Sequence, residues 1–470
     1  MRSIWLYLII AMAVRAAGEA ENPNLWWPQF RGPSGNGVAD HSDAPIHFAP
    51  ETNVAWKINT PPGHSSPCIW TGRIFLTGCV QNQLFVFCLD RGTGQELWRQ
   101  TAPATPLEPV SGLGNPAAST PATDGHLLFV YFGSFGLLAY DLDGREAWRL
   151  PLTTPITQHG AGTSPVLAGD LLLINRDQDL DSHLLAIGKL SGKILWRAER
   201  PGFRRGFSTP AIAGNLVIVP GTLRLVAYDW ATGKEQWSVS GFPNEMCSSP
   251  VVARGVVYVA GWSTGPGPAK FPAFQNLLDS SDQDKDGRLS RTEAPPGPSQ
   301  QHFIYMDANK DGFLTREEYE SIARIFAASK NAVMAIRLGG HGDVSSSHVL
   351  WKQSKGLPYV PTPLFYQDRL YLVKNGGMVT CLNATNGAPF YLEERLGVTG
   401  DNYASPVAAA GKIYIASQNG SVAVLAAGDS FNILARNSMG EKVMATPAIV
   451  ENRLYLRTAS HFYAFGTGSK

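Results

Sequence analysis

The chain has almost no net charge, few cysteines and no long apolar run among its 470 residues. Its 39 Lys and Arg residues balance 38 Asp and Glu residues, and no basic run stands out, so we expect neither a nucleic acid nor an anionic membrane surface as a partner. Five cysteines are a sparse and odd-numbered set, which excludes a disulfide framework. We therefore expect the cysteines to fill space in a protein core.

The first twenty residues have the layout of a secretory signal peptide. Arg2 precedes an apolar stretch from Ile4 to Val14, and small residues follow up to Ala20. The alternative is a buried N-terminal element, but this order of residues favours export to the periplasm or the extracellular space. The apolar stretch is too short to span a bilayer. Because the first cysteine is Cys68, we expect no lipid anchor and a soluble mature protein.

A Ser-Pro or Thr-Pro pair recurs eight times, at Ser66-Pro67, Thr120-Pro121, Ser164-Pro165, Thr209-Pro210, Ser249-Pro250, Thr362-Pro363, Ser405-Pro406 and Thr446-Pro447. Most successive copies lie 40 to 54 residues apart, which is the length of a unit of four short strands. The interval from Ser249 to Thr362 is 113 residues, so about 70 residues are inserted in the fifth unit.

Each unit carries strand signals and a turn before its last strand. In the first unit, apolar runs at 73–77 and 84–89 precede a turn at 90–94. A glycine stands four positions before a tryptophan at Gly94/Trp98, Gly144/Trp148, Gly192/Trp196 and Gly233/Trp237. The pattern predicts an all-β fold, an eight-bladed β-propeller. A row of separate β-sandwiches is the alternative, which the uniform period disfavours.

The fullest copy of the motif is Ala227-x-Asp229-x-x-x-Gly233-x-x-x-Trp237. It resembles the tryptophan-docking repeat of the pyrroloquinoline-quinone (PQQ) propellers, and the repeat covers roughly residues 53–465. Cys88 and Cys381 occupy the position of Ala227, so we expect buried thiols there. Tyr391 and Leu434 replace the tryptophan in the sixth and seventh units, which predicts weaker docking on that side.

The last unit ends one strand short, and residues 53–58 form an isolated strand with Trp56. We expect this strand to complete blade eight and so remove an open sheet edge. The predicted divisions are the signal peptide 1–20, a leader 21–52, blades one to five 53–262, the insertion 263–330, and the remaining blades 331–466. Within the leader, Trp27 to Pro33 resembles the leader of exported propellers and should pack on one face of the ring.

The insertion contains two acidic loops with the pattern of an EF-hand calcium site, so the full fold prediction is a propeller with a small α-helical EF-hand insertion. Calcium prefers six to eight hard oxygens. In the first loop we expect ligands from Asp282, Asp284, Asp286, the backbone of Arg288, Ser290 through a water, and Glu293. We expect the Arg288 side chain to take no part.

The second loop repeats the pattern after apolar residues at helical spacing. We expect its ligands from Asp307, Asn309, Asp311, the backbone of Phe313, Thr315 and Glu318. Pro295, Pro296 and Pro298 shorten the helix after the first loop, so the pair should be compact and open little. Because extracellular calcium would fill even weak loops, two calcium ions with a structural role are expected.

Two classes of function remain open. The first is a non-catalytic binding or assembly platform, similar to the propeller lipoprotein of the outer-membrane assembly machinery, with another envelope protein or a small ligand as partner. The second is a PQQ-dependent alcohol or sugar dehydrogenase. That family usually has adjacent cysteines at the cofactor, and this chain has none. We therefore favour the platform, with no catalytic residues assigned and PQQ a less favoured cofactor.

Polar and aromatic residues precede each Ser/Thr-Pro pair. If these residues lie on loops at one mouth of the central channel, they form a ligand funnel of His64, Asn115, His159, Arg205, Glu245, Tyr359, Tyr403 and Lys442. Ordinary loop polarity is the alternative explanation.

Overall fold

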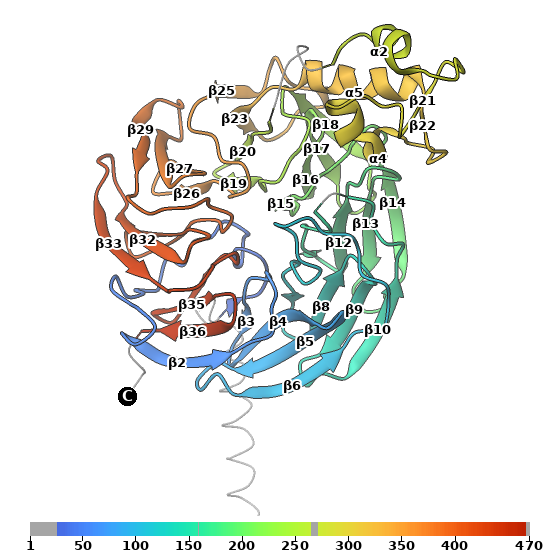
Figure 1. The fold of residues 1–470 in the computed structure, drawn as a ribbon. Helices are drawn as coiled ribbons and strands as arrows, with labels where there is room; N and C mark the ends of the chain where they lie inside the picture. The colour runs from blue at the N-terminus through green and yellow to red at the C-terminus, as the bar shows by residue number, and fades with distance from the viewer. Residues whose placement is uncertain (1–25, 158, 265–270, 467–470) are drawn as a thin grey trace, which may run out of the picture.

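The computed structural model of the protein describes residues 26–157, 159–264 and 271–466. Its strands form eight radial sheets around a central axis, and a small helical domain stands at one edge of the ring (Figure 1). The eight-bladed propeller is confirmed. The predicted signal peptide lies outside the described residues. None of the helices described is both long enough and apolar enough to cross a membrane.

Each blade has four antiparallel strands, which in the first seven blades pair in chain order from the axis outwards. Blade one consists of β3 (Cys68–Trp70), β4 (Arg73–Val80), β5 (Gln83–Asp90) and β6 (Glu96–Thr101), and blade two of β7 (Ala122–Thr123), β8 (Leu127–Phe132), β9 (Gly136–Asp141) and β10 (Glu146–Pro151). Blade three consists of β11 (Val166–Ala168), β12 (Leu171–Arg176), β13 (His183–Gly188) and β14 (Ile194–Glu199), and blade four of β15 (Ala211–Ala213), β16 (Leu216–Gly221), β17 (Arg224–Asp229) and β18 (Glu235–Ser240).

The other four blades follow the same plan. Blade five consists of β19 (Val251–Ala253), β20 (Val256–Gly261), β23 (Ala332–Arg337) and β25 (Val349–Gln353), and blade six of β26 (Leu364–Tyr366), β27 (Arg369–Lys374), β28 (Met378–Asn383) and β29 (Pro389–Arg395). Blade seven consists of β30 (Val407–Ala409), β31 (Lys412–Ala416), β32 (Ser421–Ala426) and β33 (Ile433–Ser438), and blade eight of β34 (Ala448–Val450), β35 (Arg453–Arg457), β36 (His461–Phe465) and β2 (Val54–Asn59).

The ring closes by joining the two ends of the chain. Strand β2 pairs antiparallel with β36, from Val54 opposite Phe465 to Asn59 opposite His461, so the last blade takes its outer strand from the start of the ring. Figure 1 shows this blue strand beside the red C-terminal strands. The closure gives β36 an outer neighbour, so the last blade also has four strands. This protects its sheet from edge-to-edge pairing.

The Ser/Thr-Pro pairs form a belt around the axis. At seven junctions the backbone N–H of one pair donates to the hydroxyl of the pair in the next blade, from Ser66 to Thr120 through to Ser405 to Thr446, at 2.9–3.2 Å. The proline that follows keeps its predecessor extended and brings no N–H of its own to the crowded axis. The belt therefore links neighbouring blades from inside.

Tryptophans link the blades from outside. Five of them place the indole ring on a glycine of the next blade and donate Nε1–H to a carbonyl of the same turn at 2.8–3.1 Å; they are Trp56, Trp98, Trp148, Trp196 and Trp351. Across the sheet, each ring faces an alanine or a cysteine, as in the Trp98–Cys88 pair. Cys88 and Cys381 are fully buried, in agreement with their predicted packing role.

Three junctions lack this contact. The Tyr391 hydroxyl is buried without a hydrogen-bond partner, and Leu434 is only partly buried, so docking around blades six to eight is weaker, as the sequence predicts. The sequence did not reveal a third exception at Trp237, whose Nε1 is also buried without a partner. There the turn of blade five is replaced by an excursion with β24 (Gly342–Asp343) that pairs with β18.

The leader crosses one side of the ring. Strand β1 (Trp26–Trp27) pairs with β3, and a bridge joins Val38 to Ala408. The fully buried Arg31 donates to the carbonyls of Pro363 and Pro406 at 3.0 and 2.9 Å, and desolvation without a carboxylate contact lowers its pKa to about 9. The leader thus contacts the prolines of two belt pairs.

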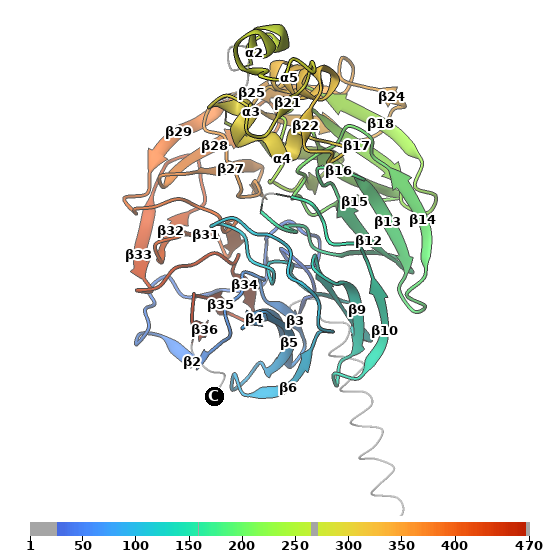
Figure 2. The same ribbon diagram turned by 45° about the vertical axis from the view of Figure 1, so that its right-hand side comes forward.

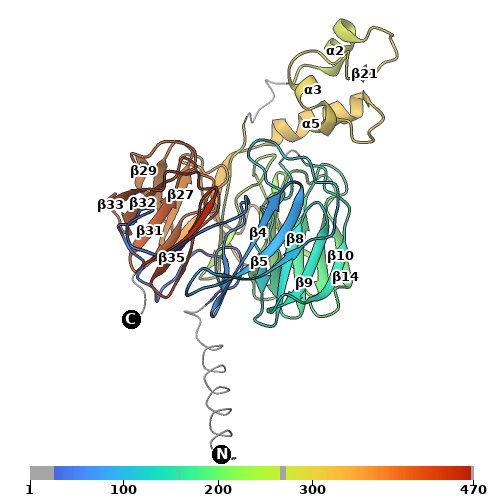
Figure 3. The same cartoon turned by 60° about the horizontal axis from the view of Figure 1, so that its bottom comes forward.

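The insertion leaves the ring between β20 and β23 and has a core of its own. It contains α2 (Phe274–Ser281), β21 (Leu289–Ser290), α3 (Pro298–Gln301), α4 (Phe303–Met306), β22 (Phe313–Leu314) and α5 (Arg316–Ala328). Phe274, Leu289, Leu314 and Tyr319 pack into one apolar cluster that contains no blade residue. Figures 2 and 3 show this domain projecting from one face, with α5 nearer the ring than α2.

A matched pair of glycine substitutions tests the tryptophan contacts. Gly192 and Gly214 have similar positive φ values of 66° and 60°, but a Cβ at Gly192 would lie 2.7 Å from Trp148 whereas a Cβ at Gly214 meets nothing within 4 Å. Both Gly→Ala changes carry backbone strain. We expect Gly192→Ala to lower the free energy of unfolding by about 1–3 kcal/mol more than Gly214→Ala, measured by denaturant titration. Equal losses would refute a specific indole contact.

Candidate functional site

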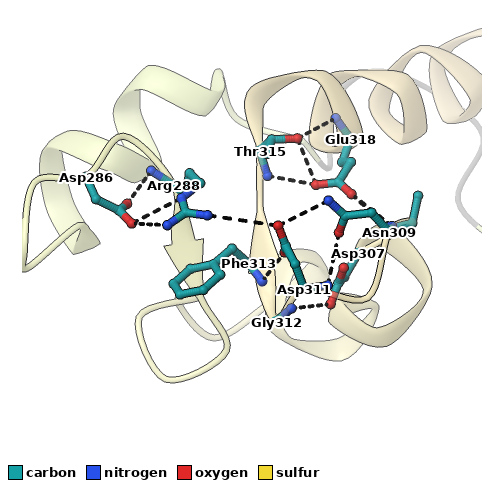
Figure 4. Close-up of polar contacts among 10 residues, drawn as sticks. Asp286, Arg288, Asp307, Asn309, Asp311, Gly312, Phe313, Thr315 and Glu318 are labelled. Carbon is teal, nitrogen blue, oxygen red and sulfur yellow. Dashed lines mark hydrogen bonds and ion pairs between the residues drawn. The ribbon is translucent and has the colours of Figure 1, made fainter.

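The two acidic loops have nearly identical internal hydrogen bonds, and Figure 4 shows those of the second loop. The N–H groups of Gly287 and Gly312 each donate at 3.0 Å to Oδ2 of the first loop residue, Asp282 or Asp307. Gly287 and Gly312 adopt φ values of 80° and 87°, which glycine tolerates best. Leu289 pairs with Leu314 in a two-stranded sheet, so the loops lie side by side.

The last glutamate of each loop points back into the loop. Glu293 Oε2 accepts from the Ser290 N–H at 2.8 Å, and Glu318 Oε2 accepts from the Thr315 N–H at 3.0 Å. Thr315 and Glu318 also cap α5 reciprocally, which sets where the helix starts. Hydrogen bonds from Ser290 and Gln283 lower the pKa of Glu293, so this carboxylate is charged at neutral pH.

One oxygen in each loop is buried without a partner. Asp282 Oδ1 and Asp307 Oδ1 accept no hydrogen bond, although each is the first predicted ligand of its loop. Oxygens of Asp282, Asp284 and Glu293 lie within 4.8 Å of one another. An unpaired buried carboxylate oxygen is costly unless a cation satisfies it. The residues therefore fit a hard divalent cation in both loops.

The side chain of Arg288 lies closer to the loops than the sequence suggested. Its guanidinium donates to Asp286 Oδ2 at 2.8 Å and lies 4.0 Å from the centroid of the Phe313 ring. Asp311 Oδ2 is 3.9 Å from the same guanidinium. Arg288 thus competes with an ion for Asp286, a contact that the twelve-residue pattern does not encode.

The hydroxyl belt surrounds a central cavity of about 190 Å³. All eight Ser or Thr residues of the belt line it, together with the apolar side chains Phe30, Leu113, Phe207, Val360 and Met444. Phe30 also lines a separate hollow on the side of the leader, so it lies between the two spaces. The cavity is therefore bounded by the leader and open towards the loops that precede the belt, here called the mouth.

The predicted funnel is divided by the structure. Four members, His64, His159, Tyr359 and Tyr403, line the cavity. The other four do not. Lys442 is exposed, and Asn115 accepts from the Ala117 N–H within a turn. Glu245 lies behind Tyr359 and accepts from its hydroxyl at 3.0 Å, and Arg205 pairs with Asp179 at 3.3 Å. The prediction that all eight side chains converge on the cavity was wrong for these four, because the loops between blades differ in length.

The histidines of the cavity are neutral at pH 7. Burial, aided by the charge of Arg457, lowers the pKa of His64 to about 4. Burial also lowers the pKa of His159, with Glu245 and Arg205 acting in opposite directions. Among the described residues that line the cavity, none is Lys, Arg, Asp or Glu. The wall is thus apolar and hydroxyl-bearing, without charge.

This wall does not fit pyrroloquinoline quinone with calcium. The quinone carries several carboxylates, which proteins usually bind with arginine or lysine, and an axial calcium needs carboxylate or amide oxygens. The lining described above supplies neither kind of group, and Cys247 is its one cysteine. We therefore assign no step of chemistry to a quinone in this cavity.

A buried carboxyl group stands behind the cavity wall. Glu108 is 3% exposed, its Oε2 accepts from the Ala161 N–H at 3.1 Å, and its Oε1 has no partner. Desolvation raises the pKa of Glu108 from 4.5 to about 7, against smaller opposing effects of that hydrogen bond and of Arg176. The group is therefore largely protonated in mildly acidic solution.

This pKa makes stability depend on pH. Because the folded pKa lies above the unfolded value, ionisation destabilises the fold as pH rises from about 4.5 to 7, by about 3 kcal/mol in total. Glu108→Gln cannot ionise, so its stability relative to the natural protein should rise over this window and then level off. Denaturant titrations from acid to mildly alkaline pH would measure the difference. A difference that does not vary with pH would contradict the raised pKa.

Comparison with known families agrees with this architecture. The family model "Outer membrane protein assembly factor BamB" matches residues 82–289, and an EF-hand model matches residues 301–323, which contain the second loop. Among curated proteins, no sequence matches the chain significantly.

Solved structures share the fold at low sequence identity. BamB from Moraxella catarrhalis is 12% identical, with a TM-score of 0.55 over 87% of this chain and 98% of that one. A europium-containing methanol dehydrogenase is 10% identical, with a TM-score of 0.62 over 96% and 99%. The quinohemoprotein alcohol dehydrogenase from Comamonas testosteroni is 13% identical, with a TM-score of 0.58 over 96% and 81%.

These likenesses establish the fold and leave the activity open, because an outer-membrane assembly factor and a methanol dehydrogenase share it. With the blades, the tryptophan contacts and the acidic loops now described, the chain is an eight-bladed β-propeller with a helical insertion; it is similar to the BamB family model over residues 82–289 and to the EF-hand model over residues 301–323.

Proposed function

We propose that the protein is an exported, calcium-binding propeller that acts as a non-catalytic platform, binding an envelope protein or a small ligand at the mouth of its cavity. The observation that carries the calcium assignment is the matched pair of unpartnered buried oxygens, Asp282 Oδ1 and Asp307 Oδ1. The first loop would bind through Asp282, Asp284, Asp286, Arg288 O, Ser290 and Glu293, and the second through Asp307, Asn309, Asp311, Phe313 O, Thr315 and Glu318.

Two features support a binding role over a redox role. The uncharged cavity wall suits neither a polycarboxylate quinone nor an axial metal, and the chain has no adjacent cysteines. The mouth, by contrast, combines Tyr359, Tyr403 and His159, whose aromatic faces and polar atoms suit contact with a partner. Export, proposed from residues 1–20, would place the loops where calcium is abundant.

Calcium should stabilise the insertion without holding the ring together, because the insertion has a separate apolar core. At free calcium a hundredfold above the dissociation constant, the gain is about 2.7 kcal/mol. The apolar cores of the ring lie between neighbouring blades and include no residue of the insertion.

Glutamate substitutions test the calcium sites. Glu293→Gln with Glu318→Gln removes one bidentate carboxylate from each loop, and calorimetry should show the stoichiometry falling from two towards zero while the main melting transition of the ring hardly moves. Glu317→Gln is the matched control, since Glu317 is an exposed acidic neighbour outside the ligand pattern. If chelation of calcium unfolded the ring, the insertion would be an integral brace and this division would be wrong.

Reconstitution tests the non-catalytic assignment. We expect purified protein with pyrroloquinoline quinone and calcium to bind no quinone in equilibrium dialysis and to reduce no dye with alcohols or sugars, because the cavity wall has no groups for the carboxylates. Substrate-dependent dye reduction would replace the platform with the dehydrogenase alternative.

A further inference from the structure

Within the residues that the structure describes, the second EF-hand is attached to the ring by hydrogen bonds and ring stacking. Near the end of α4, the Tyr305 carbonyl accepts from the Arg204 side chain, and the Tyr305 ring lies 4.2 Å from the Arg205 guanidinium. Just after α5, the Ser329 hydroxyl donates to Asn244 Oδ1 and accepts from the Asn244 N–H, both at 3.1 Å. Both helices that flank the second loop are therefore held by the propeller.

The first EF-hand is held differently. In the part of the chain that the structure describes, no hydrogen bond or ion pair joins α2 or residues 282–293 to a blade. The first hand instead contacts the second, through the Leu289–Leu314 pairing and the bond from Arg316 to Gln275 at 2.7 Å. Figure 3 shows the same asymmetry, with α2 farther from the ring than α5.

Each attachment point is next to a residue of the mouth. Arg204 and Arg205 lie in the loop between β14 and β15, three and two residues before Phe207, which lines the cavity. Asn244 lies in the loop between β18 and β19, next to Glu245, which accepts from the Tyr359 hydroxyl. The Phe207 N–H donates to the Met246 carbonyl at 2.9 Å, so the two loops are also joined to each other.

From these contacts we infer that calcium in the second loop orders the mouth of the cavity, so that filling of this loop is coupled to the conformation of the binding site; this rests on the calcium binding proposed above. The affinity of an EF-hand depends on the arrangement of its two helices. In this protein the β14–β15 and β18–β19 loops at the mouth hold both helices of the second EF-hand and so set their arrangement. Because linkage is reciprocal, calcium in the second loop must stabilise the loop conformation that favours its own binding.

Cys247 provides a reporter at the mouth that does not require a known ligand. It lines the cavity and is partly exposed, whereas Cys68, Cys88 and Cys381 are buried. Cys79→Ser removes the other partly exposed thiol. The rate of maleimide labelling of Cys247, followed by peptide mass spectrometry, then measures how often the mouth opens, while calorimetry on the same samples counts bound calcium.

We expect calcium to slow Cys247 labelling about fivefold, the size of a modest coupling between sites. Glu318→Gln should abolish the slowing, whereas Glu293→Gln should keep it as long as calorimetry still finds the second loop filled. Combined Arg204→Ala and Ser329→Ala should retain calcium binding and reduce the slowing, since it removes the side-chain hydrogen bonds of both attachments, leaves only the Arg205–Tyr305 ring contact, and changes neither calcium loop.

The outcomes separate this inference from the proposed function. Failure of the natural protein to bind calcium in calorimetry would overturn the calcium assignment itself. Binding of two ions without any change in the labelling rate would leave calcium binding intact and overturn the coupling. Equal slowing in the doubly substituted protein would also overturn the coupling, because the effect would then not pass through these attachments.

Discussion

Contacts between neighbouring blades hold this structure together. On the inside, one backbone N–H in each linked blade donates to the hydroxyl of the next, and on the outside an indole ring rests on a glycine while its N–H reaches a carbonyl of the same turn. Each blade alone is a small sheet with exposed apolar faces. The ring is stable because every such face is covered by a neighbouring blade, and β2 completes the sheet of the last blade by pairing with β36.

The belt also determines the chemistry of the cavity. Its hydroxyls need to be short and close to the backbone to accept the neighbouring N–H, so the axis is lined by Ser and Thr rather than by charged groups. Charged residues are present at the mouth, but Arg205 and Glu245 are engaged with Asp179 and Tyr359. A repeat that serves assembly of the ring thereby leaves a neutral space, which explains the poor fit to a quinone with several carboxylates.

The insertion shows how a foreign domain can be added to such a ring. It enters between two adjacent antiparallel strands, β20 and β23, whose pairing from Val256 opposite Arg337 to Gly261 opposite Ala332 is continuous. The blade therefore keeps its register. The insertion in turn keeps its own core and touches the ring through the second hand, which places Tyr305, two residues before the second acidic loop, against Arg205 at the mouth.

Sequence alone predicted the features that are local or repeated. The eight Ser/Thr-Pro pairs, the glycine before each tryptophan and the twelve-residue loops are short patterns whose spacing directly reflects strand, turn and ligand geometry, and the weak junctions at Tyr391 and Leu434 followed from the same comparison. The tertiary structure decided what depends on distant segments. Examples are the burial of Glu108, the contact of Arg288 with Asp286, the unpaired indole of Trp237, and the division of the funnel into four residues that line the cavity and four that do not. The physical reason is that a side chain's charge state and direction depend on neighbours that the fold brings from other blades, and a repeat pattern describes only what the blades have in common.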